Sequence, residues 1–274
     1  MTTPIIAHPP ETLEGWYALH QILRFTKGRP PAARVTSFVA DTGDLLNPGR
    51  STKTKSARGK GGGGGWSCFV QLIGSTSDLM LIHFRESLDA IGAAEEIVAK
   101  SELGKAVEKS YSFLSVTEAG LYHITAELAR AAEARGGKVG DAEYARTLAG
   151  RIAAERESDH MKRRLSPAIP PDMPYVCFYP MSKRRDEGQN WYTLSLDERS
   201  RLMQSHGLTG RRYAGKIQQV ITGAIGLDAW EWGVTLFAKD PIDFKKLVTD
   251  MRFDEVSAKY AEFGDFYVGK IIKA

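Results

Sequence analysis

The chain has 274 residues, of which 42% are hydrophobic and 26% charged, and its formal net charge is +4. This composition is typical of a soluble globular protein with one large domain or two small ones, and the mild charge gives no reason to expect nucleic acid. No apolar run reaches the roughly 20 residues that span a membrane, and the N-terminus lacks the basic start and apolar core of a signal peptide. We therefore expect a cytoplasmic protein without a membrane span, in which Cys68 and Cys177 are reduced core thiols.

The first half of the chain alternates between strand and helix patterns. Residues 15–22, 66–73 and 79–84 are typical of strands, a helix follows over about 86–101, and another strand covers 110–116. An alanine-rich, charged helical segment then fills roughly 124–160, with a break at Gly136 and Gly137. The stretch 50–65 is basic and ends in consecutive glycines, which predicts a flexible loop, with an arm for an anionic partner as the alternative.

The second half repeats this plan. Strands are predicted over 174–181, 215–225, 231–238 and 265–272, with helices over 194–207 and 241–251. Ser195 is a good N-cap for the first of these helices, and Glu198 completes a capping box. We predict an α+β fold of two ferredoxin-like halves, residues 1–123 and 161–274, joined by a helical link over 124–160. A pocket is expected between the sheets of the two halves.

Most common enzyme motifs are absent from the sequence. No histidine pair is spaced four residues apart beside a glutamate, and there is no GxSxG motif, P-loop or dinucleotide-binding glycine pattern. His206 stands just before Gly207 at the predicted end of a helix. It is either a capping histidine or an inward-facing imidazole that binds a haem-type iron. Of the neighbours Gln218 and Gln219, one must face inward, toward a ligand or toward water at an edge strand.

The strand YVCFYPMSKRR holds an unusual set of side chains on one face. Because side chains alternate along a strand, Tyr179, Met181 and Lys183 point the same way, and Val176 and Phe178 point the other way. An ammonium group is unfavourable in a purely hydrophobic core, and a surface that only faces water gives no reason for the tyrosine. Together with His206 and a glutamine, this face suggests a cavity for a porphyrin with several carboxylates.

Several long runs resemble one family. The segments YVCFYPMSKRR, NWYTL, HGLTGRRYAGKIQQVITGAIGLDAWEWGVTLF and MRFDEVSAKYAEFGDFYVG are similar to the coproheme decarboxylases of the chlorite dismutase-like group, in the type that has a distal glutamine. The resemblance implies a dimeric α+β barrel within one subunit, a homopentamer, and iron-coproporphyrin III (coproheme) as both cofactor and substrate. It also implies that hydrogen peroxide drives the loss of two carboxyl groups, with haem b as product, and that the coproporphyrin ferrochelatase is a transient partner.

The resemblance also implies roles for single residues. Tyr179 matches the catalytic tyrosine, His206 the proximal iron ligand and Gln219 the distal glutamine. The implied cofactor contacts are Arg164, Tyr179, Pro180, Met181, Ser182, Lys183, Gln219 and Ser257, with Arg163 as the alternative to Arg164. Chlorite dismutase, a peroxidase on the same fold, and a haem carrier or sensor without turnover are the competing functions.

Overall fold

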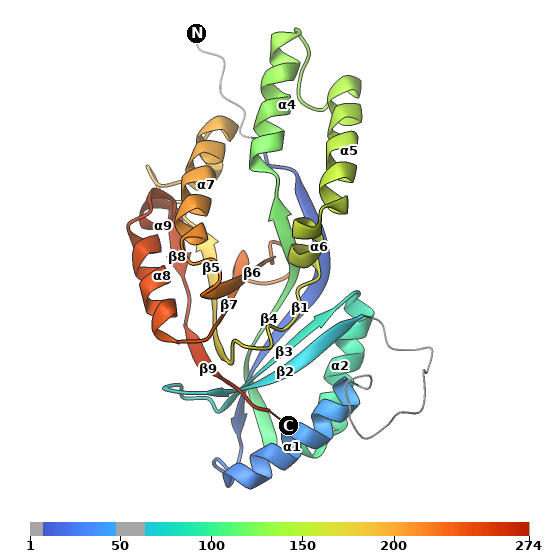
Figure 1. Ribbon diagram of the computed structural model, residues 1–274, viewed down its shortest axis with the longest axis vertical. Helices are drawn as coiled ribbons and strands as arrows, with labels where there is room; N and C mark the ends of the chain where they lie inside the picture. The colour runs from blue at the N-terminus through green and yellow to red at the C-terminus, as the bar shows by residue number, and fades with distance from the viewer. Residues whose placement is uncertain (1–7, 48–63, 274) are drawn as a thin grey trace.

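The computed structural model describes residues 8–47 and 64–273, and Figure 1 shows the arrangement of its elements. The strands are β1 (Thr12–Phe25), β2 (Gly65–Leu72), β3 (Leu79–Arg85), β4 (Val107–Gly120), β5 (Tyr175–Lys183), β6 (Ile217–Gly223), β7 (Trp232–Ala238), β8 (Ala261–Phe263) and β9 (Tyr267–Ile271). The helices are α1 (Ala32–Leu46), α2 (Leu88–Lys100), α3 (Glu102–Ala106), α4 (Tyr122–Ala134), α5 (Ala142–Glu157), α6 (Asp159–Leu165), α7 (Leu196–Arg211), α8 (Ile242–Arg252) and α9 (Glu255–Tyr260), with a 3-10 turn, η1 (Trp191–Thr193).

The strands form one closed antiparallel sheet. Their order is β7-β6-β4-β1-β3-β2-β9-β5-β8, and a further pairing of β7 with β5 closes the ring into a barrel. The two halves of the chain join edge to edge, through β4 with β6 and β2 with β9. Within each half the strand order is the same, β4-β1-β3-β2 in the first and β9-β5-β7-β6 in the second. The predicted α+β fold of two ferredoxin-like halves is therefore confirmed.

The interior of the barrel is filled with side chains. Its core combines residues from both halves: Ala18, Ile22, Trp66, Cys68, Val70, Leu72, Met80, Ile82, Phe84, Phe113, Val176, Phe178, Val220, Ala224 and Phe237. His20 is also fully buried here, stacked on Phe178 at 4.1 Å, and burial lowers its pKa to about 3 so that it stays neutral. The expected pocket between the two sheets was wrong, because this space is a packed hydrophobic core.

The helices cover the outer faces of the sheet, and the two halves differ in how tightly they do so. In the first half, Phe38, Val39, Ala94 and Val98 of α1 and α2 pack against Phe69 and its neighbours on the strands. Helix α1 was not predicted from the sequence. In the second half, α8 packs on the sheet through Phe244 and Leu247, and the cavity described below opens between α7, the end of α8 and the strands β5, β6 and β7.

The predicted helical link over 124–160 is three helices. Gly136 lies just after the end of α4. It has φ 75°, a conformation that favours glycine. Helices α4 and α5 lie side by side beyond the barrel (Figure 1). Helix α6 packs on β1 so closely that a Cβ on Gly15 would lie 2.2 Å from the Leu165 carbonyl oxygen.

The predicted basic loop over 50–65 lies outside the described residues except for Gly64 and Gly65. Its two flanks are joined by Asn47, whose Nδ2 donates to the Ser67 carbonyl and whose Oδ1 accepts from the Ser67 N–H. Within residues 8–47 and 64–273, no helix is long and apolar enough to cross a membrane. Cys177 is buried on the outer face of β5, whereas Cys68 belongs to the barrel core.

Candidate functional site

A large cavity opens between the outer face of the second-half sheet and the helices. Its volume is about 1240 Å³, and its walls come from β5, β6, β7, β8, α4, α6, α7, α8, α9 and the segment 166–173. Tyr179, Met181 and Lys183 all line it, whereas Val176 and Phe178 point into the barrel core. The prediction that these three side chains share a face is confirmed, and that face looks away from the barrel interior.

Tyr179 is held against aromatic rings at the cavity wall. Its ring stacks on Phe266 at 4.4 Å between centroids and lies 5.9 Å from the ring of Phe263. The side chain is only 8% exposed, and burial raises the pKa of the phenol well above its usual value. The hydroxyl therefore keeps its proton at neutral pH and can lose a proton and an electron together.

Lys183 is a buried cation with an incomplete environment. It is 8% exposed, and its Nζ lies 4.5 Å from the ring centroid of Trp191. Burial lowers the pKa of Lys183 to about 8, although the charges of Asp254 and Glu231 oppose this shift. Within the described residues, no carboxylate lies within ion-pair distance of this ammonium group. Since an unpaired buried charge is unfavourable, this environment indicates that a ligand supplies an anion beside Lys183.

His206 lies within α7 rather than at its end. The helix begins after Ser195, whose hydroxyl accepts from the Glu198 N–H as the capping box predicts, and it continues through Gly207 to Arg211. The predicted helix end at Gly207 was wrong, and so was the capping role for His206. The imidazole lines the cavity, and its Nδ1 lies 2.7 Å from Oδ2 of Asp254. This leaves Nε2 as the nitrogen for a metal.

Asp254 fixes this histidine from a well-defined position. It is the N-cap of α9, where Oδ2 accepts from the Ser257 N–H at 3.4 Å. Burial pushes the pKa of Asp254 upward, but the hydrogen bond and charge of His206, the Ser257 N–H and the charge of Lys183 together hold that pKa below its usual value. Asp254 was missed in the sequence, although the pattern of an aspartate three residues before Ser257 is an N-cap signal. Ser257 itself is buried and lines the cavity, and its role as a cofactor contact stays a prediction.

The two neighbouring glutamines point to opposite faces of β6. Gln219 pairs with Leu236 and shares the outer face with Ile221 and Tyr179, so its amide lines the cavity. Gln218 pairs with Phe237, and its Nε2 donates to the Ala168 carbonyl at 3.1 Å. Both glutamines line the cavity, and the distal role of Gln219 stays a prediction.

The two candidate arginines, Arg163 and Arg164, both line the cavity near the end of α6. Arg164 is held in place by its Nε, which donates to the Glu118 carbonyl at 3.2 Å. This anchor favours Arg164 as the ligand contact. Pro180 and Ser182 do not line the cavity, because alternation places them on the opposite face of β5 from Met181. Their role stays a prediction.

The donor set of the cavity fits a haem-type porphyrin with carboxylate substituents. His206 offers one metal ligand, and apolar side chains such as Val234, Leu247 and Met251 form the walls. Five of the lining residues are cations: Arg163, Arg164, Lys183, Arg211 and Arg252. Gly207 follows His206 on α7 and lines the cavity, and its missing side chain leaves room for a flat ligand against this helix.

Comparisons with solved structures agree with this fold. A structure described as a novel haem-binding protein from Thermus thermophilus has a TM-score of 0.73 and 38% identity, and covers 99% of this chain and 95% of that chain. Chlorite dismutase from Candidatus Nitrospira defluvii has a TM-score of 0.63 at 18% identity, covering 95% of this chain and 92% of that chain, which shows the shared fold alone. Fold and site together define an α+β barrel protein with a large cavity on the outer face of its second-half sheet.

The sequence profile of the chlorite dismutase family matches residues 51–272. The chain belongs to the chlorite dismutase family. It is 39% identical over 271 residues to a coproheme decarboxylase of Thermus thermophilus, covering 97% of this chain and 94% of that relative. It is also 38% identical over 267 residues to a coproheme decarboxylase of Staphylococcus saprophyticus, covering 96% of this chain and 94% of that relative.

Proposed function

We propose that the protein is a coproheme decarboxylase, which uses hydrogen peroxide to convert two propionates of iron-coproporphyrin III into the vinyl groups of haem b. The observation that carries this proposal is the grouping of the Tyr179 phenol and the unpaired Lys183 ammonium in one cavity with the His206 imidazole. The names and near full-length match of the relatives at 36–39% identity support the same activity.

His206 would hold the porphyrin iron through Nε2, with Asp254 accepting a hydrogen bond from Nδ1. The carboxylate fixes the tautomer and the ring orientation of the ligand. When bound, the iron of the porphyrin reacts with hydrogen peroxide and supplies the oxidising equivalents. Gln219 faces the same cavity from β6 and can donate a hydrogen bond to peroxide.

Tyr179 links these oxidising equivalents to the propionate. It gives up an electron and its phenolic proton, and the resulting phenoxyl radical takes a hydrogen atom from the propionate side chain, which restores the phenol. Loss of carbon dioxide and of a second electron then leaves a vinyl group. Each propionate thus yields carbon dioxide, one proton and two electrons. These two electrons, that proton and one further proton from solvent reduce one hydrogen peroxide to two water molecules, so that two peroxides are consumed per coproheme.

Lys183 holds the reacting carboxylate in place. A propionate brought beside it would complete an ion pair that the protein alone does not supply, and it would raise the lysine pKa back toward its ordinary value. Positioning of this kind contributes mainly through orientation. The arginines Arg164, Arg211 and Arg252 line the same cavity and would bind the remaining carboxylates of coproheme.

The cellular setting follows from the same proposal. The protein would act in the cytoplasm as a homopentamer, receive coproheme through a transient contact with the coproporphyrin ferrochelatase, and release haem b. The resemblance to coproheme decarboxylases is the support for these statements.

The test is to add iron-coproporphyrin III and then hydrogen peroxide in steps to the purified protein, and to identify the porphyrins by mass spectrometry. We expect a singly decarboxylated porphyrin first and haem b after two equivalents of peroxide. A parallel assay for oxygen release from chlorite separates the competing function. We expect none, because in the resemblance that activity goes with an arginine where Gln219 stands. Chlorite turnover without decarboxylation would overturn the proposal.

A further inference from the structure

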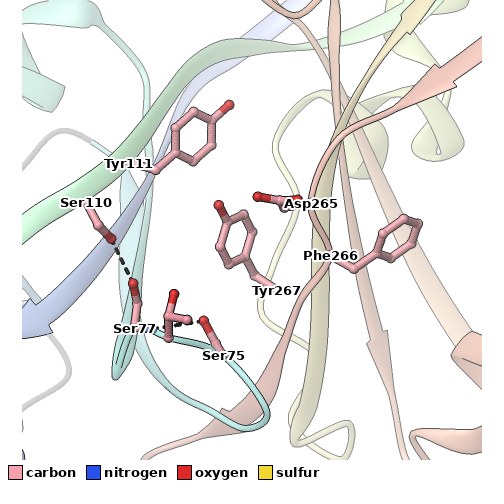
Figure 2. Close-up of a pocket in the computed structure, with 8 residues that line it drawn as sticks. Ser75, Ser77, Ser110, Tyr111, Asp265, Phe266 and Tyr267 are labelled. Atoms are coloured by element: carbon pink, nitrogen blue, oxygen red, sulfur yellow. Dashed lines mark hydrogen bonds between the residues drawn. The ribbon is translucent and has the colours of Figure 1, made fainter.

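A second, smaller pocket lies behind the wall that carries Tyr179. Its volume is about 320 Å³, and it is formed by the turn between β2 and β3, the start of β4 and the segment that leads into β9. Figure 2 shows the side chains that line it, among them Ser75, Ser77, Ser110, Tyr111, Asp265 and Tyr267. None of the lining residues is a lysine or an arginine. The size suits a ligand with a single ring.

The chemistry of this pocket favours a neutral phenol. The rings of Tyr111 and Tyr267 are stacked at 6.1 Å with 15° between their planes, which offers aromatic surface to another ring. The Ser77 and Ser110 hydroxyls, 2.8 Å apart, and the Asp265 carboxylate supply hydrogen-bond partners. The Tyr111 hydroxyl is buried and has no partner within the described residues. The carboxylate and the lack of a lining cation disfavour anions.

The strand segment around Phe266 lies between this pocket and the main cavity, and its side chains contact residues of both. The Phe266 ring stacks on Tyr179, and Figure 2 shows that it points away from the Tyr267 ring on the other side of the strand. Tyr267 is the next residue along the chain and pairs across the sheet with Phe178, the neighbour of Tyr179. The rings of Tyr267 and Phe178 are themselves stacked at 6.2 Å. Tyr179 and Tyr267 are therefore separated by the ring of Phe266 and by the paired strands β5 and β9.

We propose that this pocket is a second substrate site, where a small neutral phenol of the hydroquinone class is oxidised through Tyr111 and Tyr267 by the radical formed at Tyr179. The inference rests on the proposed function, because that function places the radical on Tyr179. This second site would act when no propionate is left to react with the Tyr179 radical. The oxidising equivalent then leaves the haem cavity along the tyrosines instead of damaging the protein.

The Tyr179 radical takes an electron from Tyr267, directly or through Phe266, and regains its proton in the haem cavity. The Tyr267 phenol loses its proton to Asp265. The donor then gives one electron to the Tyr267 radical, either directly or by way of Tyr111, and the Asp265 proton returns to Tyr267 while the donor's phenolic proton goes to solvent. Two donor radicals disproportionate to one quinone and one hydroquinone. One hydrogen peroxide and one hydroquinone thus give one quinone and two water molecules.

Binding is tested first, on protein that contains no porphyrin. Hydroquinone is titrated into the protein, and NMR signals of the labelled tyrosines are followed, with the anion ascorbate as the second probe. We expect saturable shifts of Tyr111 and Tyr267 with hydroquinone only, and about fivefold weaker binding for Asp265→Asn, which removes a charged hydrogen-bond acceptor. Hydroquinone binding that leaves both tyrosine signals unchanged would overturn the proposal.

Electron transfer is tested on protein loaded with haem b, where no propionate competes at Tyr179. Quinone formation from peroxide and hydroquinone should fall about tenfold or more in Tyr267→Phe, whereas coproheme decarboxylation by the same variant stays within about twofold. Tyr175→Phe, a change in a tyrosine at the start of β5, is the matched control and should alter neither rate. Tyr111→Phe provides a second variant if Tyr267→Phe does not fold.

The outcomes separate this inference from the proposed function. An unchanged quinone rate in Tyr267→Phe means that hydroquinone reacts at the haem edge, and the second site is then wrong. Loss of decarboxylation in the parent protein would overturn the proposed function alone, because the dependence of quinone formation on Tyr267 is measured with haem b. If Tyr267→Phe slows both reactions equally, Tyr267 serves the haem cavity, and the second site is again overturned.

Discussion

The Nδ1 of His206 lies 2.7 Å from the Oδ2 of Asp254, so the N-cap residue of α9 orients an imidazole within α7. The same carboxylate also accepts from the Ser257 N–H. One buried acid therefore connects the candidate iron ligand with a helix whose first turn lines the cavity. The packing of α7 against α9 therefore fixes the orientation of the His206 imidazole.

This relationship predicts the effect of changes at both residues. His206→Ala should weaken the binding of iron-coproporphyrin III and change the optical spectrum of the iron. Asp254→Asn keeps a good N-cap, but it replaces a charged acceptor with an amide, so we expect about 10- to 100-fold weaker binding with the spectrum of a histidine ligand retained. Titrations followed by absorbance measure both. An unchanged spectrum in His206→Ala would assign the ligand elsewhere.

Lys183 should make the stability of the ligand-free protein depend on pH. Its folded-state pKa of about 8 lies below the ordinary value of 10.5, so between these values the unfolded chain binds more protons and the free energy of unfolding rises with pH. Below pH 8 the buried charge costs on the order of 3 kcal/mol, and this cost disappears above pH 10.5.

Lys183→Met, which removes the charge and keeps the length of the side chain, isolates this effect. The variant should be more stable than the parent at about pH 7.5, and its advantage should shrink by about 2 kcal/mol at about pH 9.5, as measured by urea unfolding. An advantage that stays constant between these pH values would show that Lys183 is not the titrating group. Decarboxylation should slow in the same variant, because the propionate loses its cation.

Gly15 offers a test of how α6 is positioned. An alanine there would place a methyl group 2.2 Å from the Leu165 carbonyl oxygen and 2.6 Å from the Thr117 Oγ1. We expect Gly15→Ala to cost about 1–3 kcal/mol and to weaken coproheme binding by moving α6. Gly150→Ala in the exposed face of α5, with no atom within 4 Å, is the control and should stabilise by about 0.5–1 kcal/mol. Urea unfolding of both variants checks this, and equal effects would contradict it.

The choice between the two arginines of α6 can also be made by substitution. Arg164→Gln should weaken coproheme binding by about tenfold, because the side chain anchored on the Glu118 carbonyl is lost. Arg163→Gln should change it by less than about threefold. The reverse order in fluorescence or absorbance titrations would assign the contact to Arg163.

Much of the fold followed from local patterns, and the errors have physical causes. Alternation along β5 correctly grouped Tyr179 with Lys183, but a period of two does not say which face of a sheet is enclosed. The closure of the barrel decides that, and it depends on pairings such as Val176 with Phe237, which no local pattern encodes. The apolar side chains of Val176, Phe178 and Pro180 on the opposite face of β5 were the available signal for the barrel interior.

The end of α7 was misread for a related reason. A glycine after a histidine is a common helix end, yet Gly207 continues the helix, and it lines the cavity together with Gly210. The absence of a side chain at Gly207 leaves space beside the helix, and it is not needed for a backbone conformation that ends the helix. Helix α1 was missed although Val35, Phe38, Val39 and Leu46 are buried along one face at helical spacing. Asp254 could not be linked to His206 from sequence, because 48 positions separate them.

The central claim is that the Tyr179 phenol carries the oxidising equivalent to the propionate. Tyr179→Phe keeps the ring stacked against Phe266 and removes only the hydroxyl, so the fold and coproheme binding should be retained. The decisive measurement is mass spectrometry of the porphyrins after two equivalents of hydrogen peroxide are added to the coproheme complex of this variant. We predict that coproheme stays intact at both propionates, whereas the parent protein gives haem b. Conversion to haem b at the rate of the parent would contradict the account.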